Sequence, residues 1–531
     1  MSEPNTHRFG EAGASPEPRS LLIAAALALA TVLIAGVPPF LRLSPWTDAT
    51  QYDMAARTLQ QGGALYRDIF DTNWPGMAWL HLAIRSALGW RYEALRGVDL
   101  VIVGSVAWML AGWLRRLGLS TAGAIWTAAA ILGWYVGQPE EMHCQRDVWM
   151  LLPLVAAARL RFGSPGIMRS LGEGALWATA LWIKPFAGVP ALACWTTAAA
   201  LGLRRREMAS DLTALVIGGG VVAALGIIAL RAGGSWADFR DIVVNWDPGY
   251  VMNTYGFTVR RRLLEHWVKD LRPTSYATIV AVVAACVGWA RAIRSDRPVD
   301  EYRRHVAGMA SLLLGIFVEA AFLQPRVHPY VMAPAIMLAF PMLAAVVEYY
   351  RPPRAVAVTA AAVALALLAR PIFAAPRITL WTESWAPADV FALRDELGTT
   401  FLDGRPEWRD LRAVAAFLAA NHVKDGEVIC FNDTTHPLYL MLGIKPPIRF
   451  MQFNVLIGGM PLHRREVQMA LARSGARYVV SDLGGIVPEP QTAAVPPRWA
   501  DKYPWNCPVV LRQGRYFVHV HSTTVSPFWQ D

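Results

Sequence analysis

Long apolar runs separated by short polar segments dominate the chain up to about residue 375. Many are about 20 residues long, the length that an α-helix needs to cross roughly 30 Å of hydrocarbon. This pattern predicts a polytopic α-helical membrane protein with about eleven transmembrane helices. The spans are expected near 20–43, 97–115, 119–137, 147–161, 172–186, 187–203, 211–231, 275–292, 306–323, 330–349 and 354–374.

Arginines are concentrated in alternate loops between these spans, which places those loops and the N-terminus in the cytoplasm. An odd number of spans then places the C-terminus in the periplasm, as expected for a bacterial inner-membrane protein. The first run is too long for a signal peptide and no cleavage site follows it, so it should remain as a span. Residues 1–19 are polar and rich in Pro and Gly, which predicts a disordered cytoplasmic tail.

The pattern changes after the transmembrane region, 20–375. Residues 376–531 carry charges and turn residues, and short helices and strands alternate there as in a soluble domain. Helical periodicity at 407–422 precedes a strand at 426–431, and a helix, a Gly turn and a strand follow within 464–483. These elements and a further strand at 514–521 predict a small C-terminal extracytoplasmic α/β domain.

Composition supports the membrane assignment, because 54% of the residues are hydrophobic and only 17% are charged, against about 25% charged in soluble domains. The net charge of +10 is segregated by loop, so topology explains it and no nucleic acid partner is expected. The five cysteines form no C-x-x-C pair, which argues against a zinc ribbon or redox motif. Cys430 and Cys507 share the C-terminal domain, and spacing leaves open whether they pair.

Two outer loops, 44–96 and 232–273, are long or charged. In the first, apolar positions at i, i+3, i+4 and i+7 predict an amphipathic helix in the membrane plane, ended by Gly62 and Gly63. The positions are Tyr52, Ala55, Ala56 and Leu59. Asp48 lies at the start of this helix, where a carboxylate is kept ionised by the helix dipole. Alternatively, Thr47 or Asp48 merely caps the helix.

A second acidic group lies in the short loop "QPEEMHCQRDVWMLLP". It contains Glu140, Glu141, His143 and Asp147. Glu140 and His143 have the Glu-x-x-His spacing of some metal sites, but no second half accompanies it. A solvated turn is an equal alternative.

Cations also lie on the outer side, against the positive-inside bias. They are Lys184, Arg260, Arg261, Arg262, Arg326 and, when protonated, His328. Such a cluster needs an anion, and lipid phosphate is available there; pairing with Glu265, Asp247 or the acidic loops is the alternative. Carboxylates can take a proton from an acceptor hydroxyl while cations stabilise a phosphate leaving group, which suits sugar transfer from a lipid phosphate.

At this point several motifs resemble those of polytopic GT-C glycosyltransferases. "TDATQYDMAARTLQQGGALYRDIFDTNWPGMAWL" is similar to the first outer loop of the protein mannosyltransferase-like, aminoarabinose transferase-like and rhizobial galacturonosyltransferase-like group. The matching positions are Asp48, Tyr52, Gly63, Tyr66, Arg67, Asp68, Asp71 and Pro75. "QRDVWMLLP", "WIKPFAGVP" and "RVHPYVMAPAIMLAF" resemble later motifs of these enzymes.

The resemblance implies a GT-C fold, a polyprenyl-phosphate sugar donor, an envelope glycan, lipid or protein acceptor, and inversion at the anomeric carbon. Asp48 would be the general base, with Asp147 and Glu141 as further catalytic candidates. Expected substrate-binding residues are Tyr52, Tyr66, Arg67, Asp68, Asp71, Lys184, Arg260, Arg261, Arg262, Arg326 and His328. Ala49 and Trp74 depart from the group's acidic residue and Lys, so the sugar is undetermined and a divalent cation is only a candidate cofactor.

The alternative functions are a transporter or lipid-linked glycan flippase and a membrane-bound assembly scaffold. Transporters place charges near the bilayer midplane. The expected spans are almost free of central charges, and Glu319 lies near an outer end. This distribution favours catalysis at the outer surface. A scaffold would leave the acidic loops unexplained.

Overall fold

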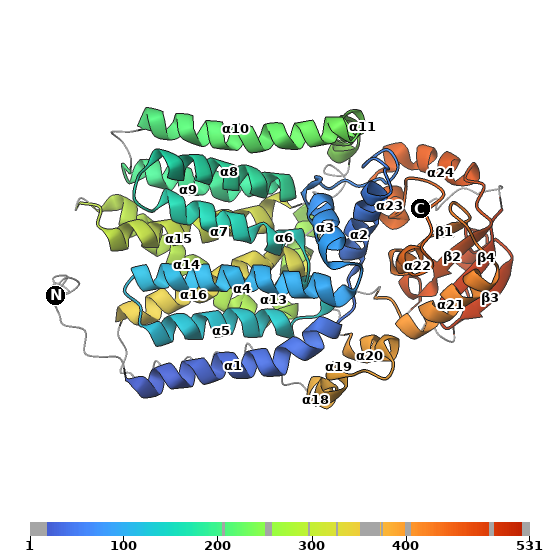
Figure 1. Cartoon of the computed structure of the whole chain (residues 1–531), viewed down its shortest axis with the longest axis horizontal. Coiled ribbons are helices and arrows are strands. Elements are labelled where there is room, and N and C mark those ends of the chain that lie inside the picture. Colours follow the sequence, from blue (N-terminus) through green and yellow to red (C-terminus); the bar gives the residue numbers. More distant parts are fainter. Residues whose placement is uncertain are drawn as a thin grey trace.

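The computed structural model describes residues 18–203, 208–249, 257–295, 298–324, 328–350, 372, 375–398, 405–487 and 493–522. The chain is a multi-pass membrane protein with a bundle of apolar helices and a small mixed sheet near its C-terminus (Figure 1). Within the described residues, six helical segments are both long and apolar enough to cross a membrane. They are Arg19–Arg42, Tyr92–Arg116, Met208–Ala232, Thr274–Arg294, Glu301–Leu323 and Pro329–Val346.

Long helices lie side by side to form the bundle (Figure 1). They are α1 (Arg19–Arg42), α4 (Tyr92–Arg116), α5 (Thr121–Gly137), α7 (Leu151–Arg161), α8 (Ile167–Ile183), α9 (Gly188–Ala200), α10 (Met208–Ala232), α14 (Thr274–Arg294), α15 (Glu301–Val318) and α16 (Ala333–Tyr350). Each expected span coincides with one of these helices except 354–374, which lies almost wholly outside the described residues.

Glycines let two bundle helices approach closely. A Cβ built on Gly174 of α8 would lie 2.0 Å from the carbonyl oxygen of Leu215 on α10, and one on Gly218 of α10 would meet Leu171 in the same way. Such small-residue contacts are typical of membrane helices, because apolar burial alone does not drive helices together in lipid. The other side of α10 exposes large apolar side chains, as expected for a lipid-facing surface: Val216, Ile217, Val221, Leu225 and Ile228.

Short elements gather at the end of the bundle where α1 ends (Figure 1). The first outer loop supplies α2 (Thr47–Gln60) and α3 (Gly76–Leu88). Other short elements of the membrane region are η1 (Glu140–Met142), α6 (Arg146–Trp149), η2 (Pro185–Ala187), α11 (Trp236–Asp241), η4 (Ile242–Trp246), α13 (Phe257–Asp270), η5 (Glu319–Leu323) and η6 (Pro329–Met332).

The sequence predicted α2 and its end before Gly62, which has φ +79°, but its environment was predicted wrongly. All residues from Ala49 to Ala56 are buried, so the helix has no solvated face over this stretch. The capping hypothesis is also wrong, because Trp46 is the N-cap residue and no side chain caps the helix. The helix is covered because α3, the bundle and the C-terminal segment all pack against it, contacts that local periodicity does not report.

The C-terminal segment contains a four-stranded sheet in the order β1-β2-β4-β3. Its strands are β1 (Val428–Cys430), β2 (Tyr478–Asp482), β3 (Val509–Gln513) and β4 (Tyr516–Val520). β1 is parallel to β2, and the other pairs are antiparallel. The helices around it are α18 (Ala375–Thr379), α19 (Trp381–Trp385), α20 (Val390–Leu397), α21 (Trp408–Ala420), η7 (Asp433–Thr435), α22 (Pro437–Leu442), α23 (Phe453–Gly459), η8 (Pro461–His463), α24 (Arg464–Ala472), η9 (Leu483–Gly485) and α25 (Pro497–Ala500).

The expected α/β elements at 407–422, 426–431, 464–483 and 514–521 are all present, whereas β3, α22 and α23 were not predicted. Cys430 and Cys507 are both buried free thiols.

One hydrophobic core joins the C-terminal segment to the first outer loop. Its buried members include Met54 and Ile69 of that loop together with Val428 and Val480 of the sheet. At the contact, the Phe70 ring lies 5.4 Å from that of Phe450, centroid to centroid. The backbone N–H of Phe70 donates to the carbonyl of Arg449 at 2.7 Å. The first loop is therefore held between the bundle and the sheet.

Candidate active site

Asp48 lies in a polar cluster at the end of the bundle that carries the predicted outer loops. It is the second residue of α2, and its carboxylate takes hydrogen bonds from the side chains of Gln145 and Tyr330 and faces the charge of Arg146. Burial raises the pKa of Asp48 above its usual value, and the charge of the nearby Asp147 raises it further. Arg146 and the two hydrogen bonds lower the pKa, but they do not cancel the effect of burial. A carboxylate with a raised pKa is a stronger base than an ordinary surface aspartate.

Arg146 is the cation at the centre of this cluster. Its guanidinium donates to the side chain of Asn73 in the first outer loop and lies 4.0 Å from the Asp147 carboxylate. Burial alone would lower the pKa of Arg146, but the surrounding Tyr52, Asp147, Tyr330 and Asp48 raise it, so the side chain stays charged. A quarter of that side chain remains exposed, 25%, which leaves room to meet an anion.

Two further carboxylates flank the cluster. Burial raises the pKa of Asp71 to about 6, and the neighbouring Asp48 adds to the effect. Asp71 accepts hydrogen bonds from the backbone and side-chain nitrogens of Asn73, at 2.9 and 2.8 Å. Burial and the charge of Asp71 raise the pKa of Asp247 to about 7. Both carboxyls can therefore change protonation near neutral pH.

A buried ion-pair chain extends from the cluster into the bundle. The Lys184 ammonium contacts the Asp147 carboxylate and lies 2.9 Å from Oε1 of Glu319. The side chains of all three residues are at most 1% exposed. Glu319 begins η5, a π-helical turn at the end of α15, and its carboxylate also accepts from Gln324. Since buried charges are costly in a membrane protein, such a chain marks a functional region.

The cluster is reachable from outside. Asp48, Arg146 and Tyr330 each retain some accessible surface, whereas Tyr52 beside them is buried at 3% exposure. A hydroxyl-bearing molecule that reaches Asp48 would meet a proton acceptor and a guanidinium together. This combination suits proton removal coupled to departure of an anionic group.

The structure thus brings together the predicted residues Asp48, Tyr52, Asp71, Asp147 and Lys184. Lys184 has two carboxylate partners and no exposed surface, so the geometry favours the pairing alternative over direct phosphate binding.

Other predicted residues lie elsewhere. Arg67 and Asp68 form a partly exposed ion pair, and Asp68 also accepts from the backbone of Ala64 at 2.7 Å. Tyr66 is buried, and its hydroxyl donates to the carbonyl of Asn73 at 2.9 Å. Glu141 is fully buried, so the solvated-turn alternative does not describe this loop. These residues shape the loops around the cluster.

The predicted outer cations are only partly described. Arg261 on α13 is 72% exposed and pairs with Glu265 at 2.9 Å, as the pairing alternative anticipated. The side chains of Arg260 and Arg262 lie outside the described residues, as does Arg326 entirely. His328 is half-buried, and its ring stacks on Tyr330 at 5.3 Å.

Sequence reasoning missed several cluster members. Arg146 stands inside the "QRDVWMLLP" motif and Tyr330 inside "RVHPY", so both lay within recognised stretches but were not selected. Glu319 was considered only as a charge near a helix end. Asp247 was considered only as a partner for arginines. No spacing in the chain signals that Glu319 approaches Lys184 and Asp147, or that Asp247 approaches Asp71.

No group of three or more His, Cys, Asp or Glu side chains in the described part of the chain is arranged to hold a metal ion. The carboxylates near Asp48 are instead interleaved with Arg146 and Lys184. This donor set does not fit a divalent cation, so the chemistry proposed below uses protein groups alone.

Comparison with solved structures identifies the fold. The chain is similar to the crystal structure of ArnT from Cupriavidus metallidurans bound to undecaprenyl phosphate, with a TM-score of 0.55 and 15% sequence identity. The match covers 97% of this chain and 100% of that one. No protein-family profile and no curated protein sequence matches the chain. Over the matched 97% the chain therefore has a fold similar to that of ArnT, which confirms the predicted polytopic α-helical membrane architecture with a small C-terminal α/β part.

Proposed function

We propose that the chain is a membrane glycosyltransferase that moves a sugar from a polyprenyl-phosphate donor to an envelope acceptor. The observation that carries this proposal is the pairing of Asp48, a carboxylate with a raised pKa, with Arg146, a partly exposed guanidinium. Asp48 can act as a base toward an acceptor hydroxyl, and Arg146 can bind a phosphate. ArnT, which shares the fold, was crystallised with undecaprenyl phosphate, and this supports a donor of the same chemical class.

In the proposed reaction, the acceptor hydroxyl gives its proton to Asp48 as its oxygen attacks the anomeric carbon. The bond from that carbon to the phosphate oxygen breaks, and the phosphate leaves with the electron pair. Arg146 stabilises the negative charge that develops on this leaving group. A single displacement inverts the anomeric configuration. The acceptor is an envelope glycan, lipid or protein on the periplasmic face.

The buried chain of Asp147, Lys184 and Glu319 has a positioning role in this scheme. Lys184 balances two carboxylates that would otherwise be buried unpaired, which would be costly. Asp147 is thereby fixed next to Arg146. The guanidinium is then held on one side by Asn73 and on the other by Asp147, so little ordering is needed when phosphate arrives.

A transporter or flippase of lipid-linked glycans is the second candidate, and one observation favours it. Lys184 and Glu319 are buried charges within the helical bundle, and transporters use such groups along their pathways. The two functions differ in one result. Purified protein in vesicles should transfer or slowly hydrolyse a radiolabelled polyprenyl-phosphate sugar if it is an enzyme, whereas a flippase moves the lipid without cleavage.

Asp48→Asn tests the proposal most directly. The variant keeps the size of the side chain and its hydrogen-bonding capacity toward Gln145 and Tyr330 but removes the base, so transfer should fall about a hundredfold or more. Asp68→Asn is the matched control, because Asp68 lies in the same loop in a partly exposed pair with Arg67. Near-normal transfer by Asp48→Asn, with loss on Asp147→Asn instead, would assign the base to the second acidic loop.

A further inference from the structure

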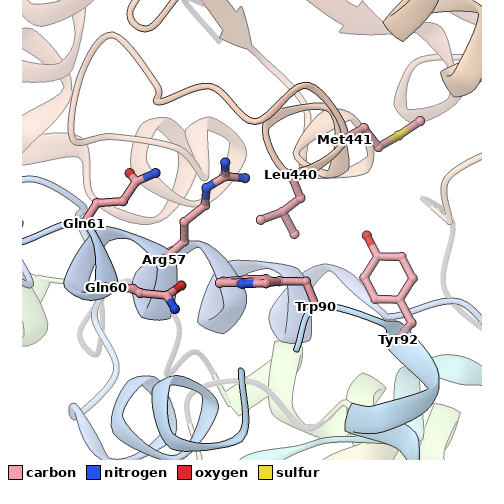
Figure 2. A pocket seen from close by; sticks show the side chains of 7 residues that line it. All are labelled: Arg57, Gln60, Gln61, Trp90, Tyr92, Leu440 and Met441. Atoms are coloured by element: carbon pink, nitrogen blue, oxygen red, sulfur yellow. The ribbon is translucent and has the colours of Figure 1, made fainter. Parts of the chain in front are cut away.

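A cavity lies away from the candidate active site. A cavity of about 420 Å³ opens between the C-terminal half of α2, the start of α4 and α22 (Figure 2). Arg57, which lines it, follows Asp48 by nine positions on α2. That separation is about 14 Å along a helix and about half a turn around it, so the cavity faces away from Asp48. The proposed sugar transfer does not use it.

The lining combines three kinds of chemistry. Figure 2 shows the Trp90 ring between Arg57 and Tyr92, with Leu440 of α22 on the far side of the opening. Gln60 and Gln61 add side-chain amides next to Arg57. In such a cavity the guanidinium can bind an anion, the amides can hydrogen-bond to hydroxyl groups, and the aromatic ring can pack against the C–H groups of a ligand.

The Arg57 guanidinium has spare capacity. Its Nη1 donates a long hydrogen bond of 3.4 Å to the carbonyl of Tyr439. Asp425 is near enough to influence its charge, but among the described residues no carboxylate forms a hydrogen bond with it. The side chain is half-buried. A half-buried arginine without a hydrogen-bonded carboxylate is suited to a ligand carrying phosphate or carboxylate.

Contacts with Arg85 fix the position of Trp90 in the cavity wall. The Arg85 guanidinium lies 5.5 Å from the Trp90 ring centroid and donates to the carbonyls of Gly89 at 3.3 Å and Arg91 at 2.8 Å, on either side of Trp90. Arg85 is itself held by the buried carboxylate of Asp53, at 2.7 and 2.5 Å.

Tyr92 is fixed from the other side. Its ring lies 4.7 Å from the Arg394 guanidinium and 5.8 Å from the Trp408 ring, centroid to centroid. A ligand would therefore meet rings that are already ordered, and binding would lose little conformational entropy.

The cavity lies at the depth of lipid head groups. Tyr92 is the first residue of α4, a helix able to span the membrane. Leu88 and Trp90, just before it, are 55% and 37% exposed. Exposed apolar and aromatic side chains at the start of a span are typical of the bilayer boundary, where Trp and Tyr concentrate. A lipid in the outer leaflet can thus enter the cavity laterally from the bilayer.

We propose that this cavity binds an anionic membrane lipid whose head group carries both a phosphate and a polyol. Arg57 contacts the phosphate, Gln60 and Gln61 contact hydroxyls, and the polyol carbons lie over Trp90. The acyl chains extend past Leu88 into the bilayer. This site stands independently of the sugar-transfer function.

Native mass spectrometry of the full-length protein, delipidated in detergent, tests the proposal. Phosphatidylglycerol has the required head group, phosphatidylcholine lacks the hydroxyls and the net charge, and glycerol 1-phosphate lacks the acyl chains. Phosphatidylglycerol should bind at least about tenfold more tightly than either alternative. Comparable binding of phosphatidylcholine or glycerol 1-phosphate would overturn the proposal.

Variants separate the cavity from general surface charge. Arg57→Gln should weaken phosphatidylglycerol binding about tenfold, because a charge-assisted hydrogen bond is lost, while Arg57→Lys should retain most of it. Arg91→Gln is the matched control, since Arg91 is exposed on the same turn but does not line the cavity. Equal losses for Arg57→Gln and Arg91→Gln, or no loss for Arg57→Gln, would contradict the assignment. Sugar transfer and the melting temperature of Arg57→Gln report whether the variant is folded.

Discussion

At the scale of single residues, the site depends on one guanidinium among several carboxylates. Asp48, Tyr52 and Asp71 could be selected from the sequence because they fall in one loop and fit one motif. Arg146 could not be ranked above other arginines in the same way, because its importance comes from its contacts with Asn73 and Asp48. The sequence lists candidate acids well, but the cation that serves them is defined only by tertiary contacts.

Arg146→Gln should change the pH dependence of transfer in a defined direction. The charge of Arg146 favours the ionised form of Asp48, so its removal makes Asp48 easier to protonate and raises the pKa further. The acid limb of the kcat/KM profile should therefore move to higher pH, and transfer at neutral pH should fall. Profiles of the wild type, this variant and Arg67→Gln provide the measurement. A limb that stays in place, or moves equally in Arg67→Gln, would show that Asp48 is not the titrating base.

At the scale of elements, a buried clamp joins α2 to α3. The Asp53 carboxylate on α2 accepts from Arg85 and lies 2.8 Å from His81, both on α3. Burial alone would raise the pKa of Asp53, but these two partners lower it below its usual value. The sequence predicted α2 and its end, because helix periodicity and Gly62 are local signals. It could not predict the clamp, which needs a second helix at a fixed angle.

Asp53→Asn should destabilise the fold by about 3–5 kcal/mol, because it leaves the Arg85 charge buried without its partner. Asp68→Asn should cost much less, since its pair with Arg67 is partly exposed and screened by solvent. Thermal or denaturant unfolding of both variants in the same detergent gives the comparison. Equal stability of the two variants would mean that the clamp adds nothing.

The clamp also has a pH signature. Because the folded pKa of Asp53 lies below its usual value of 3.8, the stabilisation is complete at neutral pH. It is lost only as the pH falls below 3.8 toward the folded pKa. The Asp53→Asn variant should therefore lack this component of acid destabilisation.

At the scale of the whole molecule, the first outer loop, the polar cluster and the C-terminal sheet share one end of the bundle (Figure 1). The start of α1 lies at the other end. The lengths of the apolar runs and the distribution of arginines predicted that these parts lie on the same side, since both patterns extend over tens of residues. They could not predict that the first loop and the sheet share a core, because its members Ile69 and Val480 are distant in sequence.

Reporter fusions should give opposite signals at the two termini. Alkaline phosphatase fused to the C-terminus should be active, because the arginine-rich loops favour a cytoplasmic N-terminus and an outer C-terminus. A fluorescent protein that matures only in the cytoplasm should be bright at the N-terminus and dark at the C-terminus. The reverse pattern would place the Asp48 cluster in the cytoplasm and remove the proposed reaction from the periplasmic face.

The shared core also dictates an order of events during synthesis. The carbonyl of Tyr66 accepts from Arg449, and that of Tyr439 accepts from Arg57, across separations of 383 and 382 residues. The ribosome therefore releases the first loop long before the segment that covers it exists. Until the last part of the chain has been made, Phe70 lacks its contact with Phe450 and keeps only earlier partners such as Trp246, whose ring lies 4.5 Å away. Such partly uncovered surfaces invite aggregation and holding by chaperones. The loop that carries Asp48 acquires its complete packing only at the end of synthesis, so a nascent or truncated chain can occupy the membrane before the candidate site is assembled.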